Sequence, residues 1–138
     1  MEDRELRRAC AFLGFLLVAL PMWAATRPAT EQEAIDWLLL EVKGSDAVFI
    51  RNGSEYDGEK AAAHLKSKLF WAGKRVQTAR DFIVGVASHS EASSKPYEIR
   101  SRDGKQRPLE TWLFERLEIF EKAAKARAAG PRAAGRRD

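Results

Sequence analysis

Residues 47–69 read AVFIRNGSEYDGEKAAAHLKSKL, and this stretch decides the fold. Residues 47–50 are apolar and largely β-branched or aromatic, and Asn52 and Gly53 follow directly after Arg51, which predicts a strand over residues 47–51 that ends in a tight turn. From residue 57 or 58 to about residue 74 the apolar residues recur at helical spacing. This spacing predicts a helix whose inward residues are Ala61, Leu65, Leu69 and Ala72.

Capping signals place two more helices around this segment. Thr30 and Glu33 form a capping-box pattern, which predicts a helix that begins near Thr30 and ends at Gly44. Thr78 and Asp81 repeat the pattern in its acidic form and predict a further helix. Each predicted helix carries an apolar face, so we expect both to pack against a common core.

The rest of the predicted domain lies after residue 88. A second strand is predicted at residues 97–100, before a turn at residues 103–104, and Pro108 begins the last helix. Two strands of this length are not stable alone, so we expect them to pair with each other under a cover of helices. The predicted fold is a small, helix-rich α+β domain with a short two-stranded sheet and no internal repeat. We expect three tryptophans to belong to its core: Trp37, Trp71 and Trp112.

The first 26 residues have the layout of a secretory signal peptide. Arg7 and Arg8 precede a dense apolar stretch at residues 9–20, Pro21 closes that stretch, and small residues follow it. A membrane-spanning helix needs about 20 apolar residues, so this stretch is marginal as an anchor. We therefore expect cleavage of a signal peptide at residues 1–26 and a periplasmic or secreted protein, with an uncleaved anchor as the alternative.

The formal charge of +4 is concentrated at the C-terminal end. Residues 122–138 carry six basic side chains and one acidic one, whereas residues 27–121 carry 15 basic and 16 acidic ones. The composition predicts a globular domain at residues 27–121 and a basic disordered tail at residues 122–138. Such a tail is suited to weak contact with a membrane or another polyanion, and the near-neutral domain argues against a nucleic-acid partner.

Two polar segments beside the predicted strands supply the candidate binding residues. They are residues 51–56 and 93–97, and helical spacing places His64 and Lys68 on one side of the helix between them. Arginine and lysine side chains bind anionic groups, and tyrosines stack or form hydrogen bonds. We expect the binding surface for a ligand or partner to consist of Arg51, Asn52, Tyr56, His64, Lys95 and Tyr97.

A family resemblance rests on the order and spacing of four short segments, which are FIRNGSEY (49–56), AAAHLKSK (61–68), TARDFIVGVAS (78–88) and KPYEIR (95–100). They resemble the YfeK-like family of small exported bacterial proteins, over about residues 31–117. The resemblance implies a signal peptide and a domain of unknown function. The chain departs from the family pattern in one loop, where Ser94 stands at a position that relatives fill with glycine, and a positive φ there would be harder for serine.

No catalytic centre is indicated by the sequence. It has no G-x-S-x-G turn, no H-E-x-x-H motif and a single cysteine, so we expect neither a metal nor another cofactor. The leading interpretation is a non-enzymatic binding or accessory module of the bacterial envelope, whose partner is an envelope protein or polymer and whose oligomeric state stays open. One alternative is a small envelope hydrolase that uses His64 with Ser54, Ser93 or Ser94. The other is that these residues only stabilise the fold.

Overall fold

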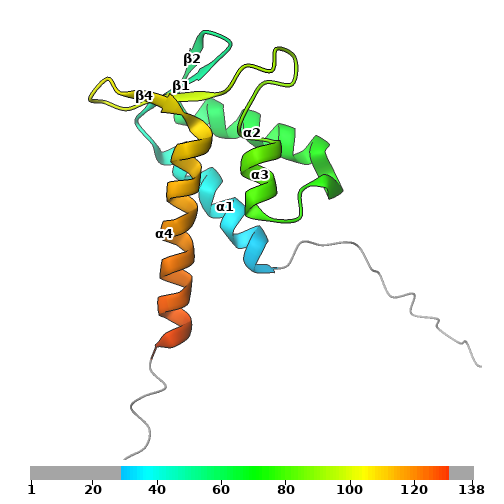
Figure 1. The fold of residues 1–138 in the computed structure, drawn as a ribbon, viewed down its shortest axis with the longest axis vertical. Helices are drawn as coiled ribbons and strands as arrows, with labels where there is room; N and C mark the ends of the chain where they lie inside the picture. Colours follow the sequence, from blue (N-terminus) through cyan, green and yellow to red (C-terminus); the bar gives the residue numbers. More distant parts are fainter. Residues whose placement is uncertain (1–28, 131–138) are drawn as a thin grey trace, which may run out of the picture.

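The computed structural model describes residues 29–130, so the predicted signal peptide at residues 1–26 lies outside the described part (Figure 1). Helices and strands mix along the chain, as expected for an α+β domain. The elements are α1 (Ala29–Gly44), β1 (Val48–Arg51), β2 (Ser54–Tyr56), α2 (Gly58–Ala72), the 3₁₀ turn η1 (Gly73–Arg75), α3 (Ala79–Gly85), β3 (Glu98–Arg100), β4 (Gln106–Pro108) and α4 (Leu109–Ala129). None of the helices within residues 29–130 combines the length and the apolar composition that crossing a bilayer requires.

The sheet has four antiparallel strands in the order β2-β1-β3-β4, and the predicted two-stranded sheet is therefore wrong. The two predicted strands are its central pair, in which Phe49 lies opposite Ile99. Hairpins at residues 52–53 and 101–105 add β2 and β4 as the two edges. Each edge strand has only three residues, which is too short to show an alternating pattern in the sequence.

Helix α1 lies at the centre of the helical layer and contacts α2, α3 and α4. Its predicted apolar face is completely buried at Ile35, Leu38 and Val42. Phe49 of β1 and Ile99 of β3 belong to the same core cluster. One core thus joins the helices to the inner face of the sheet, which lies at one end of the helical layer, beside the start of α4 (Figure 1).

Helices α2 and α3 begin where the sequence signals place them, whereas α1 already begins at Ala29, so Thr30 lies inside the helix and does not act as the predicted N-cap. Thr78 and Asp81 form the predicted capping box at the start of α3. The carboxylate of Asp57 caps α2 by accepting a hydrogen bond of 2.8 Å from the Lys60 backbone N–H. The last helix starts directly after Pro108, whose missing N–H costs nothing at a helix N-terminus.

The three tryptophans expected in the core have different environments. Trp112 is buried and makes an edge contact with Phe49, at 6.4 Å between ring centres. Trp37 is half-buried against Phe120, at 5.6 Å. Trp71, in contrast, is 78% exposed, so its assignment to the core is wrong. It follows the buried Leu69 by two positions, which places it on the opposite side of α2.

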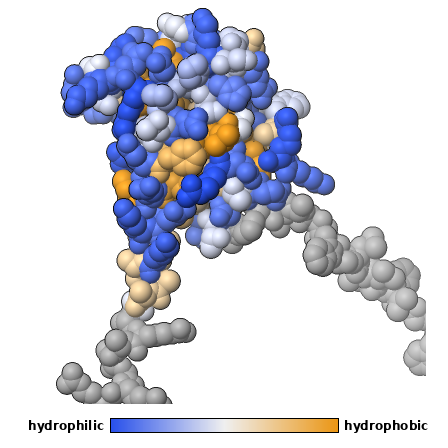
Figure 2. All heavy atoms as spheres, viewed as in Figure 1, coloured by the Kyte–Doolittle hydropathy of each residue, from blue (hydrophilic) through white to orange (hydrophobic). Residues whose placement is uncertain are grey.

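Helix α4 continues to Ala129, so the prediction of a disordered tail from residue 122 is wrong for residues 122–129. Alanine, lysine and arginine are strong helix formers, and they extend the helix past its last packed turn. The end of α4 projects from the body of the molecule (Figure 1), and its side chains there are mostly exposed. The body seen in the same view has a mostly hydrophilic surface (Figure 2).

Candidate functional site

The inner face of the sheet carries polar side chains next to the core. Side chains alternate along a strand, so Arg51 lies on the same face of β1 as the buried Phe49. Tyr56 of β2 is the register partner of Phe49 and shares this face. Tyr97 lies two residues before the buried Ile99. Strand alternation therefore places three of the expected site residues on one side of the sheet.

His64 of α2 completes this group. Arg51 Nη1 lies 2.8 Å from His64 Nδ1 and 2.9 Å from Nε2, and Nε2 lies 3.2 Å from the Tyr97 hydroxyl. Arg51 Nη2 donates a hydrogen bond of 3.1 Å to the Tyr56 hydroxyl. The guanidinium carbon also lies 5.0 Å from the centre of the Tyr56 ring, a cation–π contact. The structure thus brings together four of the six expected residues.

The imidazole of His64 is held in its neutral form. Burial is the main cause that lowers the pKa of His64 below its ordinary value of 6.5, and the positive charges of Arg51 and Lys68 lower this pKa further. A neutral imidazole has one acceptor nitrogen and one N–H group. Arg51 donates to the acceptor, which leaves the other nitrogen as a donor. The positive charges beside the imidazole are therefore those of Arg51 and Lys68.

Lys68, one helical turn after His64, ties three segments together. Its Nζ donates to the backbone carbonyls of Val86 at 2.7 Å and His89 at 2.9 Å, and to the Tyr97 hydroxyl at 3.3 Å. Burial lowers the pKa of Lys68, and the nearby Glu91 carboxylate partly offsets this shift. The three bonds match the three N–H groups of an ammonium, so Lys68 acts as a structural tie. Its spacing from His64 was the only sequence signal for this position.

Asn52 organises the neighbouring loop and does not line the site. Its φ is +51°, and Gly53 follows with a φ of +79°, as in the tight hairpin turn that the sequence predicts. Its side chain donates to Ser90 Oγ at 3.3 Å and accepts from Ser93 Oγ at 2.5 Å. Asn52 thereby fastens the loop before β3 to the β1–β2 hairpin.

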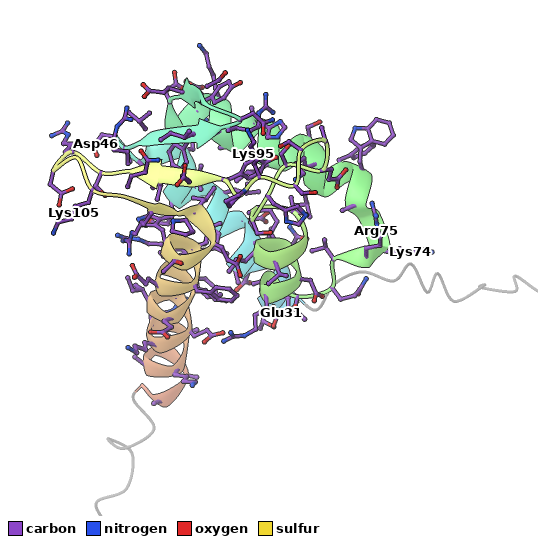
Figure 3. All side chains as sticks on the ribbon, turned by 45° about the horizontal axis from the view of Figure 1, so that its top comes forward. Glu31, Asp46, Lys74, Arg75, Lys95 and Lys105 are labelled. Atoms are coloured by element: carbon purple, nitrogen blue, oxygen red, sulfur yellow. The ribbon has the colours of Figure 1, made fainter. Side chains whose placement is uncertain are left out.

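Lys95 belongs to that loop and is exposed (Figure 3). Its backbone carbonyl accepts a hydrogen bond of 2.9 Å from the Ser90 backbone N–H, and its side chain lies outside the group around His64. The preceding residue, Ser94, has a φ of +55°, so the loop does require the conformation that favours glycine.

A pocket of about 250 Å³ opens beside the four clustered residues, and we call it the Arg51 pocket. Its polar end is formed by Arg51, Tyr56, His64 and Tyr97. Its apolar wall is formed mainly by Phe49, Ala61, Leu65 and Leu109. Lys60, Ile50 and Glu98 complete the lining. A site with one polar end and an apolar wall has the usual character of a small-ligand site.

The half-buried Arg51 has no carboxylate partner. Among residues 29–130, no aspartate or glutamate forms an ion pair with its guanidinium within 4.0 Å. Glu98 is the one acidic residue of the lining, and strand alternation places it on the sheet face opposite to Tyr97 and Ile99. Its carboxylate accepts a hydrogen bond of 2.9 Å from Gln106 Nε2. The charge of Arg51 therefore faces only neutral hydrogen-bond partners.

The groups that hydrolysis requires are not assembled in the described part of the chain. No hydrogen bond within residues 29–130 joins a serine to His64. Ser88 Oγ donates to the Val84 carbonyl at 2.5 Å, so it receives the bond of 2.7 Å that joins it to His89 Nδ1. A serine that donates elsewhere has no base to activate it. The same residues also contain no cluster of three side chains suited to a metal ion.

Comparisons with known proteins identify the family of the chain. The chain belongs to the family of unknown function DUF5329, which matches residues 29–121 and so covers most of the described fold. The uncharacterized protein YfeK of Salmonella typhimurium strain LT2 is 38% identical over 88 residues, which span 64% of this chain and 72% of that protein. The resemblance noted from the sequence motifs is thereby confirmed. No solved structure was found to match the chain.

Proposed function

We propose that this protein is an exported, non-enzymatic binding module and that the Arg51 pocket takes a small ligand with a carboxylate group and an apolar body. One observation carries the proposal: a half-buried guanidinium stands at the polar end of a pocket, and no carboxylate of residues 29–130 forms an ion pair with it. A guanidinium that is partly removed from water and has no negative charge beside it is unfavourable, and a bound carboxylate would supply that negative charge.

The size and the lining of the pocket define the ligand further. A volume of about 250 Å³ equals that of about eight water molecules in the liquid, so the ligand is small. The walls from Phe49, Leu65 and Leu109 suit an aliphatic or aromatic body. The tyrosine hydroxyls at the polar end add neutral hydrogen-bonding groups around the charge. The chemistry of the site thus favours short aliphatic or aromatic carboxylic acids.

Binding of benzoate to the full chain, measured by calorimetry, tests this proposal. Benzamide, which has the same shape without the charge, serves as the matched ligand. We expect benzoate to bind more tightly than benzamide, and Arg51→Gln to weaken benzoate binding about 10- to 100-fold, as a lost hydrogen bond to a charged group would do. Arg102→Gln is the matched control, because Arg102 is an exposed arginine paired with Asp46 outside the pocket.

Three results would contradict the proposal. Equal affinity for benzoate and benzamide would show that charge plays no part in recognition. An Arg51→Gln protein that binds benzoate as the wild type does, with an unchanged melting temperature, would remove the guanidinium from the site. If Arg51→Gln only lowers the melting temperature and neither protein binds benzoate, the group around His64 is a structural network.

Export is supported by the layout of residues 1–26, which is that of a secretory signal peptide. The basic C-terminal segment, beyond the match of the family, would add weak contact with a membrane or another polyanion. Fractionation of cells and the mass of the recovered protein test the export step. A protein of full-length mass in the cytoplasmic fraction would contradict it.

A further inference from the structure

The end of α2 exposes two large aromatic side chains next to each other. Phe70 is 76% exposed and Trp71 is 78% exposed, with their rings edge to face at 5.4 Å between centres. The buried positions of this helix lie on another side of α2 and are Gly58, Ala62, Leu65 and Leu69. Phe70 and Trp71 thus contribute little to the core, and exposed aromatic pairs of this kind mark interaction surfaces.

The sequence around this pair is basic. Residues 60–80 contain six basic residues and no acidic one. Lys66, Lys74 and Arg75 are exposed, and among residues 29–130 none of the three forms an ion pair with a carboxylate. Lys66 lies one helical turn before Phe70 on α2, and Lys74 and Arg75 follow Trp71 in η1. We call these five residues the Trp71 surface.

Two acidic groups at the start of α3 are occupied by the fold. Asp81 Oδ2 accepts the backbone N–H groups of Gln77 and Thr78, each at 3.0 Å. Glu31 Oε2 accepts the backbone N–H of Ala79 at 2.7 Å. Both carboxylates thus serve the start of α3 and do not neutralise the cations that follow Trp71.

The end of α2 and η1 form a protruding tip. Helix α2 ends at Ala72, and Gly73 turns the chain with a φ of +53° into η1. Lys74 and Arg75 lie at the extremity of the molecule, opposite the hairpin that carries Lys105 (Figure 3). A protruding tip is free to approach a broad surface without a clash from the rest of the fold.

We propose that the Trp71 surface docks on an anionic lipid surface, with Phe70 and Trp71 among the headgroups and the three cations at the phosphates. Aromatic residues flanked by lysine and arginine are typical of membrane interfaces, where each amphipathic side chain has both an apolar and a charged environment. Charge complementarity disfavours a second copy of the chain, because a symmetric contact would bring two cationic surfaces together. This inference is independent of the Arg51 pocket.

Co-sedimentation of the full chain with vesicles tests the proposal. One vesicle population contains equal amounts of phosphatidylglycerol and phosphatidylcholine, and the other contains phosphatidylcholine alone. We expect Phe70→Ser with Trp71→Ser to lower the affinity for anionic vesicles at least about 10-fold. We expect Lys74→Gln with Arg75→Gln to lower the affinity for anionic vesicles by roughly 30-fold, since each lysine or arginine near an anionic membrane contributes about five-fold to the affinity.

Leu40→Ser is the matched control, because Leu40 is a 65% exposed apolar residue outside this surface. All variants keep the same N-terminal and C-terminal segments, so any lipid contact of those segments cancels in the comparison. Melting temperatures establish that each variant is folded.

Three results would overturn the proposal. The first is vesicle binding that is the same in all variants and the wild type. The second is a wild-type dimer that becomes monomeric in the aromatic double variant, with vesicle binding unchanged. The third is binding of a single-stranded oligonucleotide that is lost in the same variants while vesicle binding persists, since basic and aromatic residues also bind nucleic acid.

Discussion

Replacement of Gly58 by alanine is the sharpest test of how the first two helices meet. Gly58 begins α2 against the end of α1, and a Cβ at this residue would lie 2.3 Å from the Val42 carbonyl oxygen. It would also lie 2.8 Å and 3.0 Å from the carbonyl oxygens of Ser45 and Lys43. All three are backbone atoms, so no side-chain rotation can relieve the contact.

The size of the effect follows from this geometry. Ordinary contact begins at about 3.4 Å, so the two helix ends would have to separate by about 1 Å. Overpacking of a core costs about 1–3 kcal/mol, and a rigid backbone contact puts Gly58→Ala at about 3 kcal/mol or more. For a domain of this size, such a loss lowers the melting temperature by roughly 12 °C or more.

Gly85→Ala is the matched control, measured with Gly58→Ala by thermal and urea unfolding. Gly85 is also helical, but its added Cβ would meet no atom within 4 Å. We expect the control to be neutral or stabilising by up to about 1 kcal/mol, because alanine is the better helix former. A Gly58→Ala protein within about 0.5 kcal/mol of the wild type would refute the close approach of α1 and α2.

Two further predictions concern His64 and Ser94. The His64 pKa, followed by NMR, should lie below 6.5 and should rise in Arg51→Gln. Because the unfolded chain binds this proton more readily than the folded one, the contribution of His64 to the free energy of unfolding should be complete above about pH 6.5. It should fall as the pH drops from there through the lowered pKa. A His64 pKa at or above 6.5 would contradict the burial of the ring beside Arg51. Ser94→Gly should raise the stability by about 0.5–1 kcal/mol, because glycine adopts the φ of +55° without strain. Ser93→Gly, which loses the hydrogen bond to Asn52, is the control, and a lower melting temperature for Ser94→Gly than for wild type would contradict this reasoning.

The helices were predictable because their signals are local. The capping box of Thr78 and Asp81 lies within four residues and requires no knowledge of the rest of the chain. The same holds for the Asn52–Gly53 turn. The edge strand β2 could not be predicted, because its residues Ser54, Glu55 and Tyr56 include no β-branched or aliphatic residue and it forms only where β1 offers a partner. Strand pairing is a tertiary property, which a short segment does not encode by itself.

In the candidate site, too, local features were predictable from the sequence and tertiary contacts were not. The polar segments flanking the strands predicted Arg51, Tyr56 and Tyr97, because strand alternation determines the face of the sheet. Their contact with His64 required the packing of α2 against that face. Lys68 was underestimated because its role depends on two carbonyl groups about 20 residues away, which no sequence period reveals. Lys95, in contrast, belongs to the right loop but lies outside the pocket.

The shortness of the two edge strands has a consequence for the behaviour of the protein in concentrated solution. A free strand edge can recruit extended segments from other molecules and so seed aggregation. Here β2 presents only Ser54, Glu55 and Tyr56, and the Glu55 carboxylate pairs with Arg100. At the other edge, β4 ends at Pro108, which has no N–H to offer. With so few unpaired backbone groups and a charged or proline residue on each side, the sheet resists self-templated growth.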